Sequence, residues 1–183
     1  MKPTIMTSTG AYFRFDAPEQ SPILIQDIAH ALSNICRFTG HVKTFYCVAQ
    51  HSVMVSRIVA RQFQFQALLH DASEAYLGDV SSPLKQMLSE YKVIERRVED
   101  AIYARFGISP TEESNKAIKK ADIILLGTEK RDLMYSETLE SEKETWELLL
   151  NVPRLLEAIE PWSPAVAEEE FMKRFDELRS RAQ

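Results

Sequence analysis

The sequence predicts an all-α domain, and three observations support this fold class. Apolar residues recur at the three- and four-residue spacing of amphipathic helices along most of the chain. No stretch shows the sustained alternation of apolar and polar residues that is typical of strands. The 5 glycines and 8 prolines fall mostly between the helical patterns. We therefore expect one compact multi-helix bundle that spans residues 1–183.

The N-terminal stretch is the exception to the helical pattern. Residues 7–25 (TSTGAYFRFDAPEQSPILI) mix aromatic and turn residues, which predicts a short, irregular strand pair. Asp27 is a favourable N-cap residue and is expected to begin the first helix. The second helix is expected within residues 45–63. The third is expected to carry residues 67–80 (ALLHDASEAYLGDV) and to end near Gly78.

Helical spacing also continues through the rest of the chain. Further helices are expected at residues 83–88 (as a short helix or turn), 91–107, 109–135, 153–162 and 165–183. Gly107 is expected to stop the second of these. Residues 136–145 (SETLESEKET) are expected to form a charged loop or a solvated face.

Composition limits the classes of function. With 45% hydrophobic and 27% charged residues, the chain is expected to be an ordinary soluble globular protein. A formal net charge of −5 gives no electrostatic reason to bind long nucleic acid. No run is long and apolar enough to cross a bilayer and no signal peptide is evident, so a cytoplasmic location is expected. Cys36 and Cys47 are expected to be inert thiols rather than a disulfide or, with His41, a zinc site.

Two segments place histidines and acids where burial is expected. His51 follows Val48 by three residues and precedes Val55 by four, so it falls on an apolar stripe. A hydrogen-bonded core histidine is the alternative. His70, Asp71 and Glu74 are expected on one face of the third helix. A solvent-facing polar patch would explain poorly why apolar residues flank them.

Asp122 adds a further acid on an inward-facing stripe. It shares that stripe with Ile118, Leu125 and Glu129, and a buried acid needs a cation or strong donors. A neighbouring lysine, Lys119 or Lys120, is the alternative partner.

The residues together suit a divalent transition metal. Imidazole nitrogen and carboxylate oxygen from His51, His70, Asp71 and Asp122 would accommodate manganese, iron, cobalt, nickel or zinc. Glu74 is expected beside the metal, where it can exchange a proton with a water molecule.

The pattern of His51, His70-Asp71 and Asp122 resembles the H…HD…D signature of HD-domain phosphohydrolases. The likeness is closest to bacterial 5′-deoxynucleotidases, especially a phage- and prophage-borne branch. It extends from about Thr9 into the C-terminal helices. The segments that carry it are LSNICRFTGH, FYCVAQHSVMVSR, ALLHDASEAYLGDVSSPLK and KKADIILLGTEKRDL. The resemblance implies metal-dependent hydrolysis of the 5′-phosphate of deoxyribonucleoside monophosphates by a metal-activated water.

The resemblance also implies roles for residues around the metal. Arg37 matches the arginine that grips the phosphate, and its fork suits that task. Phe38 stands where these enzymes usually carry tryptophan, near the sugar or base. Asp79 matches the acid that accepts a hydrogen bond from the 3′-hydroxyl and excludes a 2′-hydroxyl. Lys85 would support the phosphate site or remain a solvated lysine, and Glu74 would manage the proton.

Other functions stay open at this point. Release of triphosphate from a deoxynucleoside triphosphate is one, with His41 and Lys43 reaching further phosphates and a second metal ion joining. A non-catalytic, metal-stabilised nucleotide-binding domain is another. Two related activities are disfavoured: alarmone hydrolases carry HDxxED, whereas Ala75 follows Glu74 here, and the GYP element of cyclic-dinucleotide phosphodiesterases does not occur.

Self-association is expected of a helical domain with this many apolar faces. Four residues are predicted to lie in the core or at a subunit interface: Met87, Tyr91, Tyr103 and Phe106. Glu129 and Asp132 lack an evident role. One hypothesis is that they pair with Lys130 or Arg131 of a neighbouring subunit.

Overall fold

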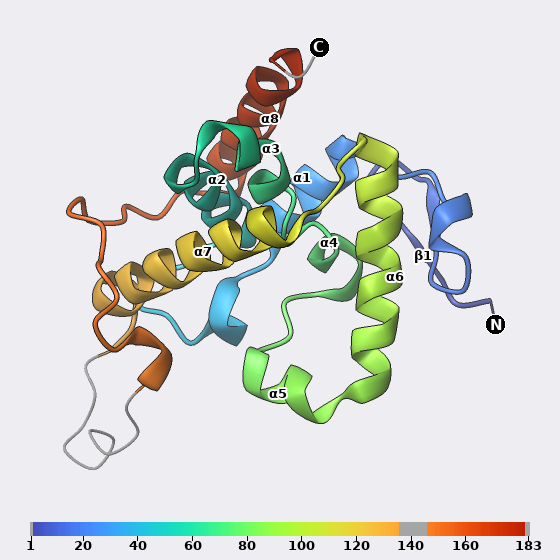
Figure 1. Ribbon diagram of the computed structural model, residues 1–183. Coiled ribbons are helices and arrows are strands. Elements are labelled where there is room, and N and C mark those ends of the chain that lie inside the picture. The colour runs from blue at the N-terminus through green and yellow to red at the C-terminus, as the bar shows by residue number, and fades with distance from the viewer. Residues whose placement is uncertain (1, 136–145, 182–183) are drawn as a thin grey trace.

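The computed structural model describes residues 2–135 and 146–181, and the predicted all-α fold is confirmed in them (Figure 1). The helices are α1 (Ile25–Asn34), α2 (Val48–Ile58), α3 (Gln64–Leu68), α4 (Glu74–Leu77), α5 (Ser82–Met87), α6 (Ser89–Phe106), α7 (Glu112–Leu133) and α8 (Pro164–Ser180). The expected N-terminal strand pair is present as antiparallel β1 (Thr4–Met6) and β2 (Tyr12–Arg14). The predicted charged stretch 136–145 lies outside the described residues.

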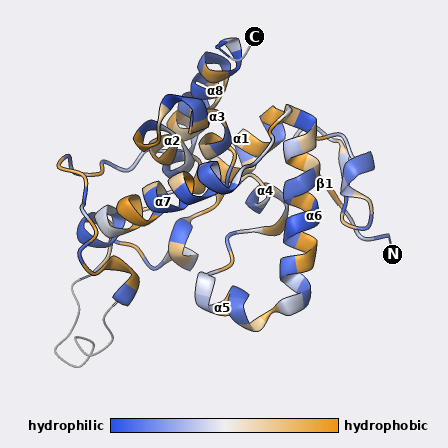
Figure 2. Cartoon of the chain, in the orientation of Figure 1, coloured by the Kyte–Doolittle hydropathy of each residue, from blue (hydrophilic) through white to orange (hydrophobic). Residues whose placement is uncertain are grey.

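Helix α2 lies between two apolar clusters. The larger cluster forms where α1, α2, α3 and α8 pack together, and Val48 and Val53 of α2 belong to it. The smaller cluster lies between α2 and α7 and takes Val55 from α2. Figure 2 shows bands of hydrophilic and hydrophobic residues along α6, α7 and α8, as amphipathic helices require. Because α2 is covered on both sides, its inward polar residues are sealed from water.

The prediction that Asp27 begins the first helix was wrong. Helix α1 starts two residues earlier, at Ile25, and Asp27 lies in its first turn. The Asp27 carboxylate accepts hydrogen bonds from Ser8 Oγ at 2.6 Å and from Thr9 N at 2.8 Å. These contacts attach the hairpin loop between β1 and β2 to α1, so the carboxylate serves a tertiary contact instead of a cap.

The predicted helix at residues 153–162 was also wrong, because this segment is irregular. Side chains of α7 bind its backbone in place of helical hydrogen bonds. Leu155 N donates to Thr128 Oγ1 at 3.0 Å, and Ile159 N donates to Asp132 Oδ2 at 2.9 Å. The apolar spacing of a helix is present, but distant side chains take the backbone groups that a helix would use.

The ends of α6 and α7 follow the sequence signals. Gly107 stops α6 in the left-handed region, as predicted. Thr111 caps α7 through a reciprocal pair of hydrogen bonds with Ser114.

Tyr103 is buried as expected of a core residue, whereas Met87 is 82% exposed. No helix in residues 2–135 and 146–181 has both the length and the apolar character needed to cross a membrane.

Alanine substitutions at two glycines are expected to change stability in opposite directions. Gly107 has a φ of 71°, so Gly107→Ala should cost about 1–2 kcal/mol of unfolding free energy. Gly127 lies within α7, and an added Cβ would meet Arg154 Cγ at an ordinary 3.6 Å. Gly127→Ala should therefore gain about 0.5–1 kcal/mol from helix propensity. Urea denaturation measures both, and shifts of the same sign would contradict the assignment.

Candidate metal centre

His51 lies in the protein interior, on the stripe of α2 that the sequence predicted. Its side chain is 0% exposed, and its Nδ1 lies 2.7 Å from Glu129 Oε1. In the neutral ring, this hydrogen bond assigns the proton to Nδ1 and leaves the lone pair on Nε2. That Nε2 is buried and has no hydrogen-bond partner in the described part of the chain. His51 is thus a core histidine whose second nitrogen remains available to a ligand.

His70 and Asp71 lie in an irregular turn between α3 and α4. The predicted continuous helix over residues 67–80 was therefore wrong, and Glu74 does not share a helix face with them. The His70 Nδ1 lies 2.7 Å from Ala67 O, the carbonyl that would accept the Asp71 amide in a continuous α-helix. The turn instead directs both His70 and Asp71 toward α2.

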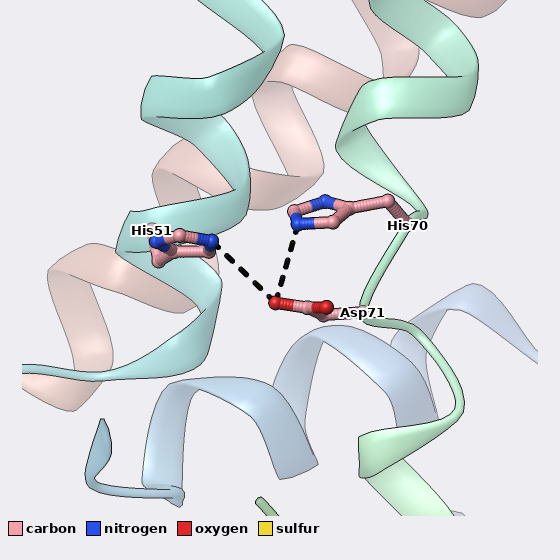
Figure 3. A group of neighbouring side chains, drawn as sticks. All are labelled: His51, His70 and Asp71. Atoms are coloured by element: carbon pink, nitrogen blue, oxygen red, sulfur yellow. Dashed lines mark ion pairs between the residues drawn. The ribbon is translucent and has the colours of Figure 1, made fainter. Parts of the chain in front are cut away.

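Three side chains converge at this point (Figure 3). The rings of His51 and His70 both point toward Asp71 Oδ2, with Nε2–Oδ2 distances of 3.5 and 3.3 Å. One potential ligand atom from each of the three residues lies within 4.8 Å of the others. Like His51 Nε2, His70 Nε2 is buried without a hydrogen-bond partner among the described residues.

The spacing of these atoms fits a shared metal ion. Separations of 3.3–3.5 Å exceed an ordinary N–H···O hydrogen bond. Two atoms that each bind one ion at about 2.1 Å lie roughly 3.0–3.4 Å apart. The donor set of imidazole nitrogen and carboxylate oxygen is also that of a divalent transition metal. The His51, His70 and Asp71 group could therefore hold a metal ion, as the sequence predicted, although this geometry does not select one metal.

Asp122 lies at the edge of this group. Its Oδ1 is 3.4 Å from His51 Nε2, and its Oδ2 is 2.7 Å from Lys119 Nζ. The carboxylate thus has the neighbouring lysine that the sequence offered as the alternative to a metal ion, while its other oxygen faces His51. Burial opposes ionisation, but His51, His70 and Lys119 outweigh it and lower the pKa of Asp122. One oxygen of an ionised carboxylate therefore faces the group as a fourth potential ligand.

Charge dominates the interior around His51. Burial and the Arg37 charge oppose protonation of His51, yet Glu129 and Asp122 raise its pKa to about 9. Burial also disfavours ionisation of Asp71, but His70, His51 and Arg37 lower its pKa. The surroundings of His51 thus stabilise positive charge, and a metal ion at Nε2 would replace the proton there as the source of that charge.

Arg37 is buried against the same group. Its Nη2 donates to Glu129 Oε2 at 3.2 Å, and its Nη1 lies 3.6 Å from Asp71 Oδ2. Burial alone would lower the pKa of Arg37, but Glu129 and Asp71 raise it, so the guanidinium stays charged. Its Nε has no hydrogen-bond partner within residues 2–135 and 146–181. One donor of the guanidinium, Nε, is therefore unused, and another, Nη1, lies beside Asp71.

The tight turn Arg37–Gly40 contains Phe38 and precedes His41, two residues that were predicted to contact the substrate. Phe38 and Thr39 both have a φ of 55°, in the left-handed region that non-glycine residues rarely adopt. The Arg37 guanidinium lies over the Phe38 ring, 5.0 Å from its centre. His41 follows the turn and is exposed. The turn thus buries Arg37 while it leaves His41 at the surface.

Glu74 begins α4 and is 5% exposed. Its Oε1 lies 3.4 Å from Lys85 Nζ, while no described residue hydrogen-bonds its buried Oε2. Burial, Asp71 and Asp79 raise the pKa of Glu74 well above its usual value. Lys85 also binds Glu95 at 2.7 Å, so it is not the solvated lysine that the sequence left open. Asp79 is half-buried and close enough to influence Glu74 electrostatically.

Glu129 is the site residue whose role the sequence did not reveal. It is 0% exposed, and its carboxylate contacts His51 and Arg37 of its own chain, contrary to a pairing with a neighbouring subunit. Its place two helical turns after Asp122 was the only signal in the sequence. Asp132 likewise binds within the chain, to Arg131 and to the Ile159 amide.

The protein is thus a helical bundle with a partly buried His/Asp group that could hold a metal ion. No protein-family model matches the chain. It is 40% identical to YfdR of Escherichia coli (strain K12), described as uncharacterized, over 175 residues that cover 95% of this chain and 94% of YfdR. An uncharacterized protein of Rhodobacter capsulatus is 34% identical over 125 residues, covering 61% of this chain and 64% of that protein. The chain belongs to the same protein family as YfdR.

Proposed function

We propose that the protein is a metal-dependent phosphohydrolase of the HD type that removes the 5′-phosphate of deoxyribonucleoside monophosphates. The observation that carries this proposal is the convergence of two unpartnered imidazole nitrogens on Asp71, directly beside a buried arginine. The resemblance of the sequence to 5′-deoxynucleotidases supports the choice of substrate.

Four residues would hold the ion in this proposal: His51, His70, Asp71 and Asp122. A divalent ion bound by these residues would lower the pKa of a water molecule and would neutralise negative charge on a phosphoryl oxygen. Both histidine rings are already oriented to bind an ion. Each Nδ1 is hydrogen-bonded at 2.7 Å, to Glu129 in His51 and to the Ala67 carbonyl in His70, and each Nε2 faces Asp71. The chain therefore needs no change of tautomer to bind an ion.

Arg37 and Glu74 would act on the substrate and the proton. The unused Arg37 donor would bind a phosphoryl oxygen and stabilise the charge that develops during hydrolysis. Glu74 Oε2 would accept the proton of the attacking water, because this oxygen has no partner among the described residues. The raised pKa of Glu74 suits a group that must both take up and release a proton.

Asp79 and Lys85 would complete the substrate pocket. Lys85 holds Glu74 Oε1 at 3.4 Å, which leaves Oε2 as the proton acceptor. Asp79 would accept a hydrogen bond from the sugar 3′-hydroxyl and exclude a ribose 2′-hydroxyl. Phe38 would pack against the sugar or base beside Arg37.

Release of triphosphate from a deoxynucleoside triphosphate is the second candidate. His41 and Lys43 are both exposed just after the Arg37 turn, where they could meet further phosphates. The metal group and Glu74 would serve either substrate, so the products decide between the two reactions.

Product analysis by chromatography tests the proposal. Purified protein with Mn²⁺ or Co²⁺ is incubated separately with dAMP, AMP and dATP, and chelator-treated protein is the control. Deoxyadenosine and phosphate from dAMP alone would support the proposed reaction and the role of Asp79. Deoxyadenosine and intact triphosphate from dATP would favour the second candidate. Failure to turn over a wider nucleotide panel would leave a metal-stabilised binding domain.

A further inference from the structure

We propose that Glu129 is a positioning residue that couples the metal ligand His51 to the phosphate-binding Arg37. The inference rests on the metal site of the proposed function. Each oxygen of the Glu129 carboxylate serves a different partner: Oε1 lies 2.7 Å from His51 Nδ1, and Oε2 lies 3.2 Å from Arg37 Nη2. The side chain is 0% exposed, so water does not compete for either oxygen.

The contact with His51 determines which imidazole nitrogen can bind a metal. A carboxylate accepts hydrogen bonds only, so Glu129 fixes the proton of His51 on Nδ1 and turns the Nε2 lone pair toward Asp71. A carboxylate partner also makes the imidazole a stronger electron donor. The Arg37 guanidinium, 3.2 Å from the other oxygen, balances the negative charge of the buried carboxylate.

The contact with Arg37 fixes the guanidinium next to the same ligands. Glu129 lies on α7, the helix that also carries Asp122 two turns earlier. Helix α7 therefore supplies one carboxylate at the edge of the metal group and another behind it. Loss of Glu129 should disturb both metal affinity and phosphate binding, whereas a purely structural ion pair would affect stability alone.

The isosteric variant Glu129→Gln separates these possibilities. Its carboxamide has one acceptor oxygen for two donors. If that oxygen faces His51, the amide NH2 group faces Arg37, and two hydrogen-bond donors then meet without an acceptor. If it faces Arg37, the amide donates to His51 Nδ1 and forces the proton onto Nε2, which blocks metal binding. Asp132→Asn is the matched control, because Asp132 lies one turn further along α7 and binds Arg131 and Ile159 instead.

Titration of the metal-free full chain with Co²⁺, followed by calorimetry and by visible absorption, tests the inference. Glu129→Gln should bind Co²⁺ about 10–100-fold more weakly, with an altered absorption spectrum, while Asp132→Asn behaves as wild type. Circular dichroism checks folding, and Glu129→Asp, which keeps the charge, should recover part of the affinity if Glu129→Gln unfolds. Wild-type Co²⁺ affinity and spectrum in Glu129→Gln would overturn the role.

Failure of this inference is distinguishable from failure of the proposed function, because Co²⁺ binding is read without substrate. A wild-type protein that binds Co²⁺ but hydrolyses no nucleotide removes the function, while loss of affinity in Glu129→Gln still supports the positioning role. A wild-type protein that binds no Co²⁺ would overturn both.

A second observation, independent of the metal, concerns the two cysteines, and we infer that they form a reversible disulfide site. Cys36 and Cys47 face each other across an isolated antiparallel bridge. Two backbone hydrogen bonds flank the pair: Arg37 N to Tyr46 O at 2.9 Å and Val48 N to Ile35 O at 3.1 Å. This pattern is that of a non-hydrogen-bonded pair, whose Cα atoms lie about 4.5 Å apart with side chains on one face. Disulfides close over Cα separations of about 4.4–6.8 Å.

The two thiols differ in exposure to solvent, and this difference sets the order in which they would be oxidised. Cys36 is half-buried and Cys47 is fully buried, and burial raises the pKa of the Cys47 thiol. Hydrogen peroxide would oxidise the Cys36 thiolate to a sulfenic acid and release hydroxide. The Cys47 thiol would then displace water from that sulfenic acid to give the disulfide. A thiol reductant returns two electrons and two protons and restores both cysteines.

Mass spectrometry and thiol titration under denaturing conditions test the disulfide site. Peroxide-treated wild-type protein should lose the mass of two hydrogen atoms and both titratable thiols, and dithiothreitol should restore them. Cys36→Ser is the matched control and should keep its single thiol. Two thiols that persist after peroxide, or a gain of oxygen atoms at Cys36 without loss of the Cys47 thiol, would overturn the inference.

Discussion

Asp71→Ala is expected to abolish metal binding at the site and to lower kcat/KM for the substrate by at least about a thousandfold. Asp71 Oδ2 is the atom on which His51 and His70 converge, at 3.5 and 3.3 Å. Without it, the remaining imidazoles lack the anionic ligand between them, so both charge stabilisation and water activation are lost together.

Metal content by mass spectrometry and steady-state kinetics measure this effect. Asp100→Asn is the matched control, because Asp100 is an exposed acid on α6. The control should retain wild-type metal content and kcat/KM. An Asp71→Ala protein that keeps stoichiometric Co²⁺ would show that the ion binds elsewhere.

Arg37→Met is expected to destabilise the fold by about 3–5 kcal/mol, in addition to weakening the proposed phosphate binding. The substitution leaves the Glu129 carboxylate at 0% exposure without its guanidinium partner. An uncompensated buried charge costs more than the intact pair contributes, since the desolvation penalty remains while the attraction is lost. Urea denaturation of the metal-free protein measures the change in unfolding free energy.

Arg57→Met provides the comparison for this prediction. Arg57 forms an ion pair with Glu170 at 3.3 Å, but its side chain is 51% exposed, so its loss should cost at most about 1 kcal/mol. The double variant Arg37→Met/Glu129→Met should recover part of the stability lost in Arg37→Met, because it removes the stranded carboxylate. Equal losses in the two single arginine variants would sink this account of the Arg37–Glu129 pair.

Periodicity located the helices that bear the site but not the turn within it. The stripe on α2 correctly placed His51 inside, and the stripe on α7 correctly placed Asp122 and Glu129 facing inward. The same reasoning wrongly extended a helix through His70 and Asp71. A side-chain hydrogen bond from His70 to the Ala67 carbonyl interrupts that helix, and no periodic pattern of apolar residues records such a bond.

The sequence did not reveal the role of Glu129 or the irregular path of residues 153–162, because both depend on partners that are distant in sequence. Glu129 and His51 are 78 residues apart, so the spacing of either helix alone could not pair them. The segment at 153–162 has helical spacing yet adopts an irregular path, because Thr128 and Asp132 of α7 capture its amides. Local patterns describe which face of an element is buried, whereas tertiary contacts decide what each buried polar atom meets.

The main-chain hydrogen bonds that hold residues 153–162 determine which amino-acid substitutions this segment can accept. The contacts that fix it use its main-chain amides and carbonyls, including Glu160 O and Trp162 N, which bind the Gln50 side chain at 2.8 Å each. Since any residue except proline offers the same amide, many exposed side chains along the segment should be exchangeable among relatives. Proline at Leu155 or Ile159 should not be tolerated, and Gln50, far away in sequence, should be the harder position to replace.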